Sequence, residues 1–176
     1  MLKINMGCGK TNFGEGWIHI DSANYKHIDY NNIFEFPYNN VDLIYASHLL
    51  SYFDITTLNN LLTYWKSKLV KNGILRLAVP DFKKMCQLYS SGWELKYFIG
   101  PLYGKMYSGD EIIFHKICFD EESLSSLLKK IGFKNLRRWD YRLVDHGIFD
   151  DHSQAYLPHM DKEKGTLISL NIECNK

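Results

Sequence analysis

The 176-residue sequence has few cysteines, and no two of them lie close enough in the sequence to form a CxxC pair. Its four cysteines, Cys8, Cys86, Cys118 and Cys174, are scattered without a CxxC motif. That spacing argues against a redox pair, a zinc site or a disulfide framework. We therefore expect reduced thiols, no bound metal and a cytoplasmic location.

Long apolar runs and an excess of one charge are also missing. No stretch approaches the ~20 apolar residues of a membrane span, and the N-terminus shows no signal-peptide pattern. Lys and Arg number 21 against 20 for Asp and Glu, a formal net charge of +1. Such a chain has no global field to attract nucleic acid or an anionic membrane. A small molecule or glycan is the expected partner, and nothing indicates the oligomeric state.

What the sequence does contain is an alternation of strand and helix patterns. The strands are expected at 2–6, 17–20, 41–48, 73–80, 133–144 and 165–174, and the helices at 54–70, 81–90 and 119–133. The third and fourth strands are nearly continuous apolar runs, which is typical of buried parallel strands. Strands alternating with helices predict an α/β domain with a mostly parallel sheet, here one domain over 1–176.

Capping residues define the expected helix ends. Asp54 or Thr56 suits the start of the first helix, and Asn72-Gly73 its end. Asp81 follows a strand, where a helix cap is a better interpretation than catalysis. Asp120 is a good cap for the late helix, which ends near Gly132. The two last strands are expected to form an antiparallel pair.

The stretch "LKINMGCGKTNFGEGWIHID" (2–21) is a strand, a glycine turn and a second strand that ends in an acid. At the carboxyl edge of a parallel sheet, Gly7 and Gly9 let a ligand approach the backbone. Asp21 is placed to accept hydrogen bonds from ribose hydroxyls. A tight structural turn with a solvated acid is the alternative. Residues 10–16 have room for at most one helical turn, so we expect a loop there and a site that is open on that side.

Five segments together resemble class I S-adenosylmethionine (SAM)-dependent methyltransferases. They are "INMGCGK", "IHID", "VDLIYASHLLSYF", "LVKNGILRLAVPDF" and "FDEESLSSLLKKIGF". The sequence is most similar to small bacterial and archaeal predicted methyltransferases. The resemblance implies a Rossmann-like, mostly parallel seven-stranded sheet with an antiparallel late strand. The helix expected between the first two strands would be shortened.

The same resemblance implies SAM as the cofactor and assigns positions to it. The implied cofactor-binding residues are Gly7, Cys8, Gly9, Asp21, Asn32, Ile33, Ala46, Ser47 and His48. Asn32 would contact adenine through its carbonyl oxygen, and Ile33 would flank the ring. Two positions depart from the family pattern. Asn5 replaces the usual acid before the glycines, and Ser51-Tyr52 replaces a Glu-His pair.

Catalysis by methyl transfer requires alignment and, for an oxygen or nitrogen acceptor, a base. His48 at the end of the third expected strand is one candidate, and its alternative role is a hydrogen bond to a neighbouring loop. His115, Asp151 and His152 are the other candidates for the catalytic group. Asp151 and His152 belong to a polar cluster in residues 145–159. The alternative interpretation of this cluster is a solvated surface turn.

Two segments have no clear periodicity that assigns them to the sheet. Four of the aromatics in residues 89–111 suit a lid over a pocket, although packing of this segment against the sheet is the better interpretation. They are Trp93, Tyr97, Tyr103 and Tyr107. Residues 145–164 form a long loop, and loops of that length in a small domain are usually functional or mobile.

Three functions compete on this evidence. The first is a SAM-dependent methyltransferase acting on a small molecule or glycan. The second is a binding protein that keeps the SAM fold without catalysis. The third is an NAD(P)-dependent reductase, because Tyr64 and Lys68 have the spacing of a reductase pair. The glycine loop lacks the longer dinucleotide-binding form, which disfavours the reductase.

Overall fold

The computed structural model describes residues 1–23, 25–108 and 111–176. Its strands are β1 Lys3–Met6, β2 Trp17–Ile20, β3 Val41–Ser47, β4 Leu69–Pro80, β5 Met106–Ser108, β6 Glu111–Ile113, β7 Lys134–Arg138, β8 Tyr156–Leu157, β9 Thr166–Leu167 and β10 Ser169–Asn175. Its α-helices are α1 Ile55–Lys68, α2 Phe82–Ser90, α3 Lys96–Tyr103 and α4 Glu121–Ile131. Four short 3-10 helices are η1 Leu50–Tyr52, η2 Tyr141–Leu143, η3 Asp145–Ile148 and η4 His152–Gln154.

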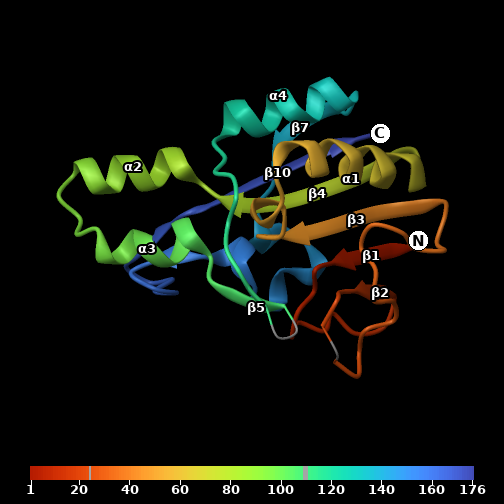
Figure 1. The fold of residues 1–176 in the computed structure, drawn as a ribbon, viewed down its shortest axis with the longest axis horizontal. Coiled ribbons are helices and arrows are strands. Elements are labelled where there is room, and N and C mark those ends of the chain that lie inside the picture. Colours follow the sequence, from red (N-terminus) through yellow and green to blue (C-terminus); the bar gives the residue numbers. More distant parts are fainter. Residues whose placement is uncertain (24, 109–110) are drawn as a thin grey trace.

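The central sheet has the order β2-β1-β3-β4-β10-β7 (Figure 1). β1 pairs in parallel with β2 and β3, and β3 pairs in parallel with β4. β10 is antiparallel to both of its neighbours, β4 and β7. The Rossmann-like, mostly parallel arrangement and its antiparallel late strand are thus confirmed.

The prediction of seven strands is wrong, because the described residues form a central sheet of six strands. The position beyond β2 holds only one parallel bridge, between Ile20 and Tyr30. The segment that would form the missing strand, residues 22–40, is rich in asparagine and contains Pro37. Such residues are depleted in strands, so the chain crosses this edge as a loop.

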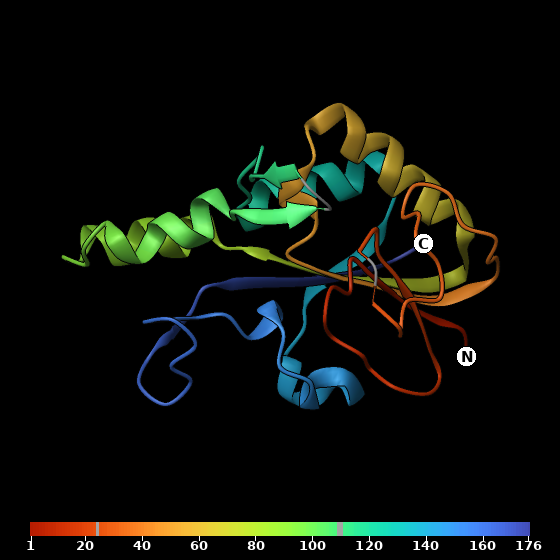
Figure 2. The ribbon, with the colours of Figure 1, turned by 60° about the horizontal axis from the view of Figure 1, so that its bottom comes forward.

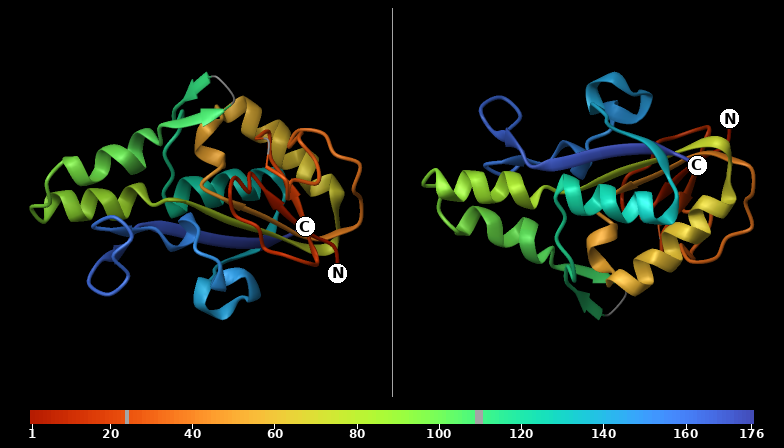
Figure 3. Two further views of the ribbon diagram at one scale, coloured as in Figure 1. Left: turned by 90° about the horizontal axis from the view of Figure 1, so that it is seen from below. Right: turned by 90° about the horizontal axis from the view of Figure 1, so that it is seen from above.

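One face of the sheet is covered by α1 and α4 (Figures 2 and 3). α1 buries Leu58, Leu61, Leu62 and Trp65, and α4 buries Leu124, Leu127 and Leu128. Both helices begin at the expected aspartates, Asp54 and Asp120, whose side chains accept backbone N–H groups of the first turn. The expected end at Asn72-Gly73 is wrong, because α1 stops at Lys68 and β4 begins at the next residue.

In the described part of the chain, the opposite face carries no α-helix (Figure 2). Aromatic side chains cover this face instead. Phe13 and Trp17, from the segment after the glycine loop, meet Trp139 and His146, from the segment after β7. We call this the aromatic face. Residues 10–16 form the expected loop, but the expectation of openness is wrong at Phe13. That side chain is 5% exposed and its ring stacks on His146 with centroids 5.2 Å apart.

Acid should destabilise the protein through His146. Burial lowers the pKa of His146 from 6.5 to about 4, and the neighbouring Arg76 acts in the same direction. As the pH falls, the imidazole of His146 is therefore protonated in the unfolded chain before it is protonated in the folded protein. The folded state has its full stability only at pH values above the unfolded pKa of 6.5. We expect the free energy of unfolding to fall by up to about 3 kcal/mol as the pH drops from 6.5 to 4.

Urea denaturation at a series of pH values measures this slope. The matched variant is His146→Phe, which keeps an aromatic ring but removes the titrating group. Its slope over the same pH range should be smaller than that of the wild type. Equal slopes in the two proteins would contradict the role assigned to His146.

α2 and α3 project from the carboxyl end of β4, away from the sheet (Figure 1). They pack with the 155–168 region in a third apolar cluster that includes Met85, Phe98 and Leu157. The lid-like segment 89–111 spans the end of α2, α3 and β5, and its positions 109 and 110 lie outside the described residues. The expected loop 145–164 contains η3, η4 and β8. No helix in the described part of the chain is long and apolar enough to cross a membrane.

Candidate functional site

The candidate site lies where β1, β2 and β3 end and β10 begins. Parallel strands place their carboxyl ends at one edge of a sheet, and β10, being antiparallel, contributes its first residue there. Ser169 is opposite Pro80 in the β10–β4 register. Ligands bind at this edge in open α/β sheets because the loops diverge there.

The glycine turn has the backbone that a ligand-facing loop needs. Gly7 and Gly9 have φ angles of 63° and 53°, a region that favours glycine. The Gly7 N–H donates to the Ile20 carbonyl at 2.7 Å, which ties the loop to the end of β2. A Cβ at Gly7 would lie 2.8 Å from the Leu49 methyl groups. The turn is therefore built for close backbone approach, and its cofactor role stays a prediction.

Asp21 braces the glycine loop directly. Its Oδ2 accepts the Gly9 N–H at 2.8 Å, and its Oδ1 accepts the Ala23 N–H at 2.8 Å. A carboxylate has about four lone-pair positions, so each oxygen still has one to offer. Among the described residues these two acceptor positions have no partner, and the predicted hydrogen bonds from ribose hydroxyls would use them.

Cys8 points into the protein between these two glycines. The side chain is 6% exposed and its Sγ is 3.9 Å from His27 Nε2. Burial, together with the nearby Asp21 and Asp29 charges, raises the pKa of the Cys8 thiol to about 12. The thiol is neutral at physiological pH, so Cys8 is not a nucleophile and offers the cofactor only its backbone.

The predicted adenine-side residues lie in the loop after β2. Asn32 is exposed, and its Oδ1 accepts the N–H groups of Phe34 and Glu35 at 2.9 and 3.2 Å. This oxygen is the atom expected to contact adenine, and it is occupied within its own loop. Ile33 is half-buried against the core, and its carbonyl accepts Trp65 Nε1–H at 3.0 Å.

A small cavity opens at the end of β3. Its volume is about 40 Å³ and its lining residues are Asn5, Gly7, Cys8, Thr11, Ser47, Asp151 and His152. Ser47 Oγ is sealed from solvent and has no hydrogen-bond partner in the described structure. An unpaired buried hydroxyl is costly, so it marks a polar position that a ligand or water would satisfy. The Ala46 side chain, by contrast, is fully buried in the core and can contribute only backbone.

The structure brings three of the four predicted catalytic residues together. The exposed His152 ring stacks on His48 with centroids 5.3 Å apart, and Asp151 lines the cavity beside it. Asp151 Oδ2 accepts the Tyr45 hydroxyl at 2.6 Å, and its Oδ1 caps η4. Burial, with smaller contributions from His152 and His115, holds the pKa of His48 well below its usual range. His48 is therefore neutral at physiological pH.

His115 has a different place. Its Nδ1 is 3.1 Å from the Pro101 carbonyl, which only accepts, so Nδ1 carries the proton. The ring packs against Tyr52 and fills the space at Gly104, where an added Cβ would collide with it. Its backbone N–H also donates to the Tyr103 carbonyl at 2.8 Å, so His115 joins α3 to the body of the domain, and it acts on His48 only through its charge.

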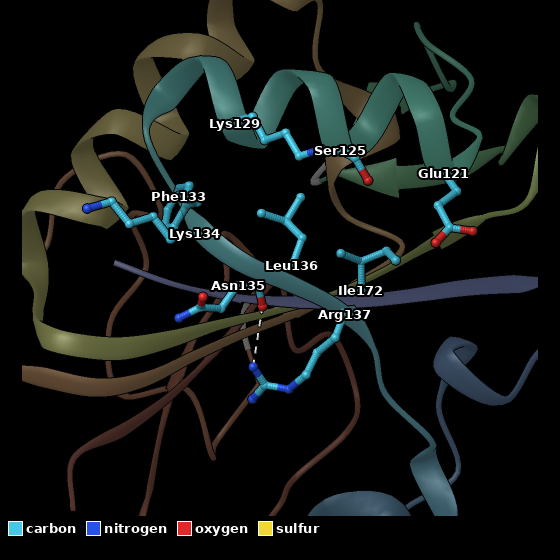
Figure 4. A pocket seen from close by; sticks show the side chains of 9 residues that line it. All are labelled: Glu121, Ser125, Lys129, Phe133, Lys134, Asn135, Leu136, Arg137 and Ile172. Carbon is cyan, nitrogen blue, oxygen red and sulfur yellow. Dashed lines mark hydrogen bonds between the residues drawn. The ribbon is translucent and has the colours of Figure 1, made fainter.

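A larger hollow lies at the far edge of the sheet, between α4 and β7 (Figure 4). Its volume is about 330 Å³, and charged side chains such as Glu121, Lys129 and Arg137 surround it. It is remote from the glycine loop and from the carboxyl ends of the parallel strands. We place the site at the smaller cavity, because the backbone and the polar groups converge there.

The residues present fit a nucleoside cofactor in part. Clefts that hold drug-sized ligands have volumes of about 300–1,000 Å³, so the small cavity takes only a fragment. The remainder would lie across the half-buried glycine loop toward Asp21 and Ile33. No group of three His, Cys, Asp or Glu side chains in the described ranges is arranged to hold a metal.

Two buried polar residues on β10 were missed by the sequence reasoning. Ser169 and Asn171 are each 5% exposed and lie on one face of the strand. Ser169 Oγ is 3.0 Å from His48 Nε2. Their signal in the sequence is the strict alternation of polar and apolar residues along β10, which places Ser169, Asn171 and Glu173 on one face of the strand.

No protein-family model matches the sequence, and no curated protein matches it. Solved structures do match it over nearly the whole chain. A SAM-dependent methyltransferase from Archaeoglobus fulgidus superposes with a TM-score of 0.62 at 16% identity, over 99% of this chain and 86% of that one. One from Methanosarcina mazei gives 0.58 at 16% identity, over 99% and 92%.

Human N-acetylserotonin methyltransferase, solved in complex with SAM, superposes with a TM-score of 0.55 at 12% identity, over 99% of this chain and 47% of the human chain. Identities this low establish the fold and leave the acceptor open. With its sheet order, its glycine loop and its antiparallel β10, the chain has the Rossmann-like fold of the class I SAM-dependent methyltransferases.

Proposed function

We propose that the protein is a SAM-dependent methyltransferase that acts on a small-molecule or glycan acceptor. The observation that carries this proposal is the contact between Asp21 and the Gly9 N–H at the carboxyl edge of the sheet. It joins the glycine loop to an acid with free acceptor positions, in a chain with the methyltransferase fold.

Bound SAM supplies a methyl group already activated by a sulfonium. The protein residues then have three tasks. The backbone at Gly7 to Gly9 accommodates the cofactor, Asp21 accepts from the ribose hydroxyls, and Ile33 flanks the adenine ring. His48 would lie near the reacting end of SAM, where positioning of the acceptor would supply most of the rate enhancement.

Two features support a small acceptor. The net charge of +1 provides no field for nucleic acid. Tyr103 and Tyr107, in the projecting α3–β5 segment, are 58% and 68% exposed. Exposed aromatic rings suit stacking on a sugar or another ring, which supports the proposed class of acceptor.

The reductase alternative loses its main support in the structure. The Tyr64 hydroxyl donates to the Phe36 carbonyl at 3.0 Å and accepts the Phe36 N–H at 2.9 Å. Lys68 Nζ donates to the Asn39 side chain. Both residues of the supposed pair thus hold the 36–39 loop against α1, away from the carboxyl edge. A SAM-binding protein without catalysis remains the second candidate, because Ser51-Tyr52 replaces the family's Glu-His pair.

Isothermal titration calorimetry with SAM, S-adenosylhomocysteine and NADP tests the proposal. We expect SAM and its demethylated product to bind and NADP not to bind. NADP binding without SAM binding would reject the methyltransferase assignment. Methyl turnover against a panel of hydroxyl, amine and thiol acceptors then distinguishes an enzyme from a silent binder.

A further inference from the structure

A chain of three hydrogen bonds links His48 to the 3-10 helix η4 through β10. Asn171 Nδ2 donates to the Ser153 carbonyl at 2.9 Å. Ser169 Oγ donates to Asn171 Oδ1 at 2.9 Å, and His48 Nε2 lies 3.0 Å from Ser169 Oγ. Ser153, Ser169 and Asn171 are all buried, so water does not compete for these contacts.

The direction of each bond follows from the carbonyl at one end. The Ser153 carbonyl can only accept, so the amide nitrogen of Asn171 faces it and Oδ1 faces Ser169. Oδ1 also only accepts, so the single hydroxyl proton of Ser169 points to it. Ser169 Oγ then has only lone pairs left for His48. Nε2 of His48 must therefore carry the proton and donate it to Ser169.

The other ring nitrogen is left as an acceptor. Nδ1 of His48 has no hydrogen-bond partner among the described residues. Among the described residues, the side-chain polar atoms that are both sealed from solvent and without a partner are Ser47 Oγ and Ser51 Oγ, so the unpartnered Nδ1 retains some contact with solvent. His48 is half-buried beneath the exposed His152 ring and directly follows Ser47, which lines the small cavity. His48 itself does not line the cavity, so Nδ1 is a solvent-reachable lone pair on the residue that follows the cavity-lining Ser47.

We infer that Ser169 and Asn171 are positioning residues that hold His48 as the Nε2–H tautomer, so that Nδ1 takes the proton of an O–H or N–H acceptor. This inference rests on the proposed function and narrows it to acceptors that release a proton. As the acceptor atom bonds to the methyl carbon, the carbon–sulfur electron pair stays with sulfur. The acceptor's proton moves to Nδ1 and then to solvent.

The charged and titratable groups around His48 are consistent with a neutral base. The groups whose charges act on it are His152 on η4 and His115 in the loop before α4, and both oppose its protonation. Ser169 and Asn171, which face it from β10, carry no charge. The ring therefore stays unprotonated near neutral pH, and the tautomer decides which nitrogen can act.

Asn171→Leu tests the inference. Leucine has a similar size but no Oδ1, so the Ser169 hydroxyl is free to donate to His48 Nε2 and would switch the ring to the Nδ1–H tautomer. Two-bond proton–nitrogen NMR correlations of the imidazole rings report the tautomer in the protein without ligand, with His48→Gln for assignment. We expect Nε2–H in the wild type and Nδ1–H in Asn171→Leu.

The matched control is Gln154→Leu. Gln154 is equally buried and donates to the Gly147 and Phe149 carbonyls, so its loss loosens the same region without touching Ser169. It should leave the His48 tautomer unchanged. With the acceptor identified in the turnover panel, Asn171→Leu should lower kcat roughly 100-fold or more, at unchanged SAM affinity, while Gln154→Leu should not.

The possible results separate this inference from the proposed function. A wild-type His48 with the proton on Nδ1 would overturn the inference, and so would a switched tautomer that leaves kcat unchanged. The calorimetric absence of SAM binding would instead overturn the proposed function, whatever the tautomer. Ser169→Ala should give a mixture of the two tautomers, because His48 Nε2 then lacks a partner.

Discussion

Replacing Asp21 by alanine is expected to weaken SAM binding by roughly 100-fold or more. Hydrogen bonds to a charged group contribute about 1.5–3 kcal/mol each, and every 1.4 kcal/mol is a factor of ten in affinity. The lost carboxylate would remove two such bonds to the ribose. It would also release the Gly9 and Ala23 N–H groups that it now holds. Calorimetric titration of the purified variant with SAM measures the effect.

The matched control for this prediction is Asp29→Ala. Asp29 also follows β2, and its Oδ2 accepts the His19 N–H at 2.7 Å, but among the described residues it makes no hydrogen bond to the glycine loop and reaches Cys8 only through its charge. Its removal should leave SAM affinity nearly unchanged. Thermal denaturation of both variants establishes that each is folded. An Asp21→Ala protein that is folded and binds SAM like the wild type would reject the ribose assignment.

Glu173→Ala is expected to have the largest effect on stability, about 3–5 kcal/mol of unfolding free energy. Glu173 Oε2 accepts Arg76 Nε–H at 2.8 Å, and its Oε1 pairs with Arg137 at 2.7 Å. The side chains of Glu173 and Arg76 are only 8% and 12% exposed. Without the carboxylate, the Arg76 charge would remain buried between β4 and β10 with no counter-ion.

Glu121→Ala provides the comparison, because it breaks an ion pair of similar length on the surface. Glu121 and Arg138 are 2.6 Å apart, but their side chains are 51% and 58% exposed. Water and salt screen such a pair, so its loss should cost about 1 kcal/mol or less. Urea denaturation of both variants compares the two pairs. Similar losses in both would show that burial does not decide the effect.

The elements with local signals were predictable from the sequence. The caps Asp54, Asp81 and Asp120 all accept the expected backbone N–H groups. Each cap is a contact between residues two or three apart, so its signal is contained in a few letters. The apolar runs that became β3 and β4 were equally clear, because both faces of these strands are buried.

Features that depend on distant contacts were not predictable in this way. The loop at 10–16 was expected, but the burial of Phe13 depends on His146, which lies far along the chain. No distinct local signal predicted that the seventh strand, beyond β2, would be missing from the described structure. The resemblance favoured a full sheet, and the polar residues of 22–40 decided otherwise.

The candidate site shows the same division. The convergence of Gly7, Asp21 and His48 follows from parallel strands that end at one edge, so the sequence was sufficient to place them. The partners of His48 come from β10, which reaches this edge only because it runs antiparallel to β4. That pairing, rather than any motif, brings Ser169 to the imidazole.

The aromatic face has a consequence for the order of folding. α1 lies between β3 and β4 in the chain and closes only short loops when it packs on the sheet. The aromatic face joins the two ends of the chain, as the ion pair between Lys3 and Asp145 does across 142 residues. Closing long loops costs more entropy and slows folding. During synthesis, this side of the sheet therefore stays uncovered until residues 139–149 have emerged, whereas α1 can pack on β1, β3 and β4 before then.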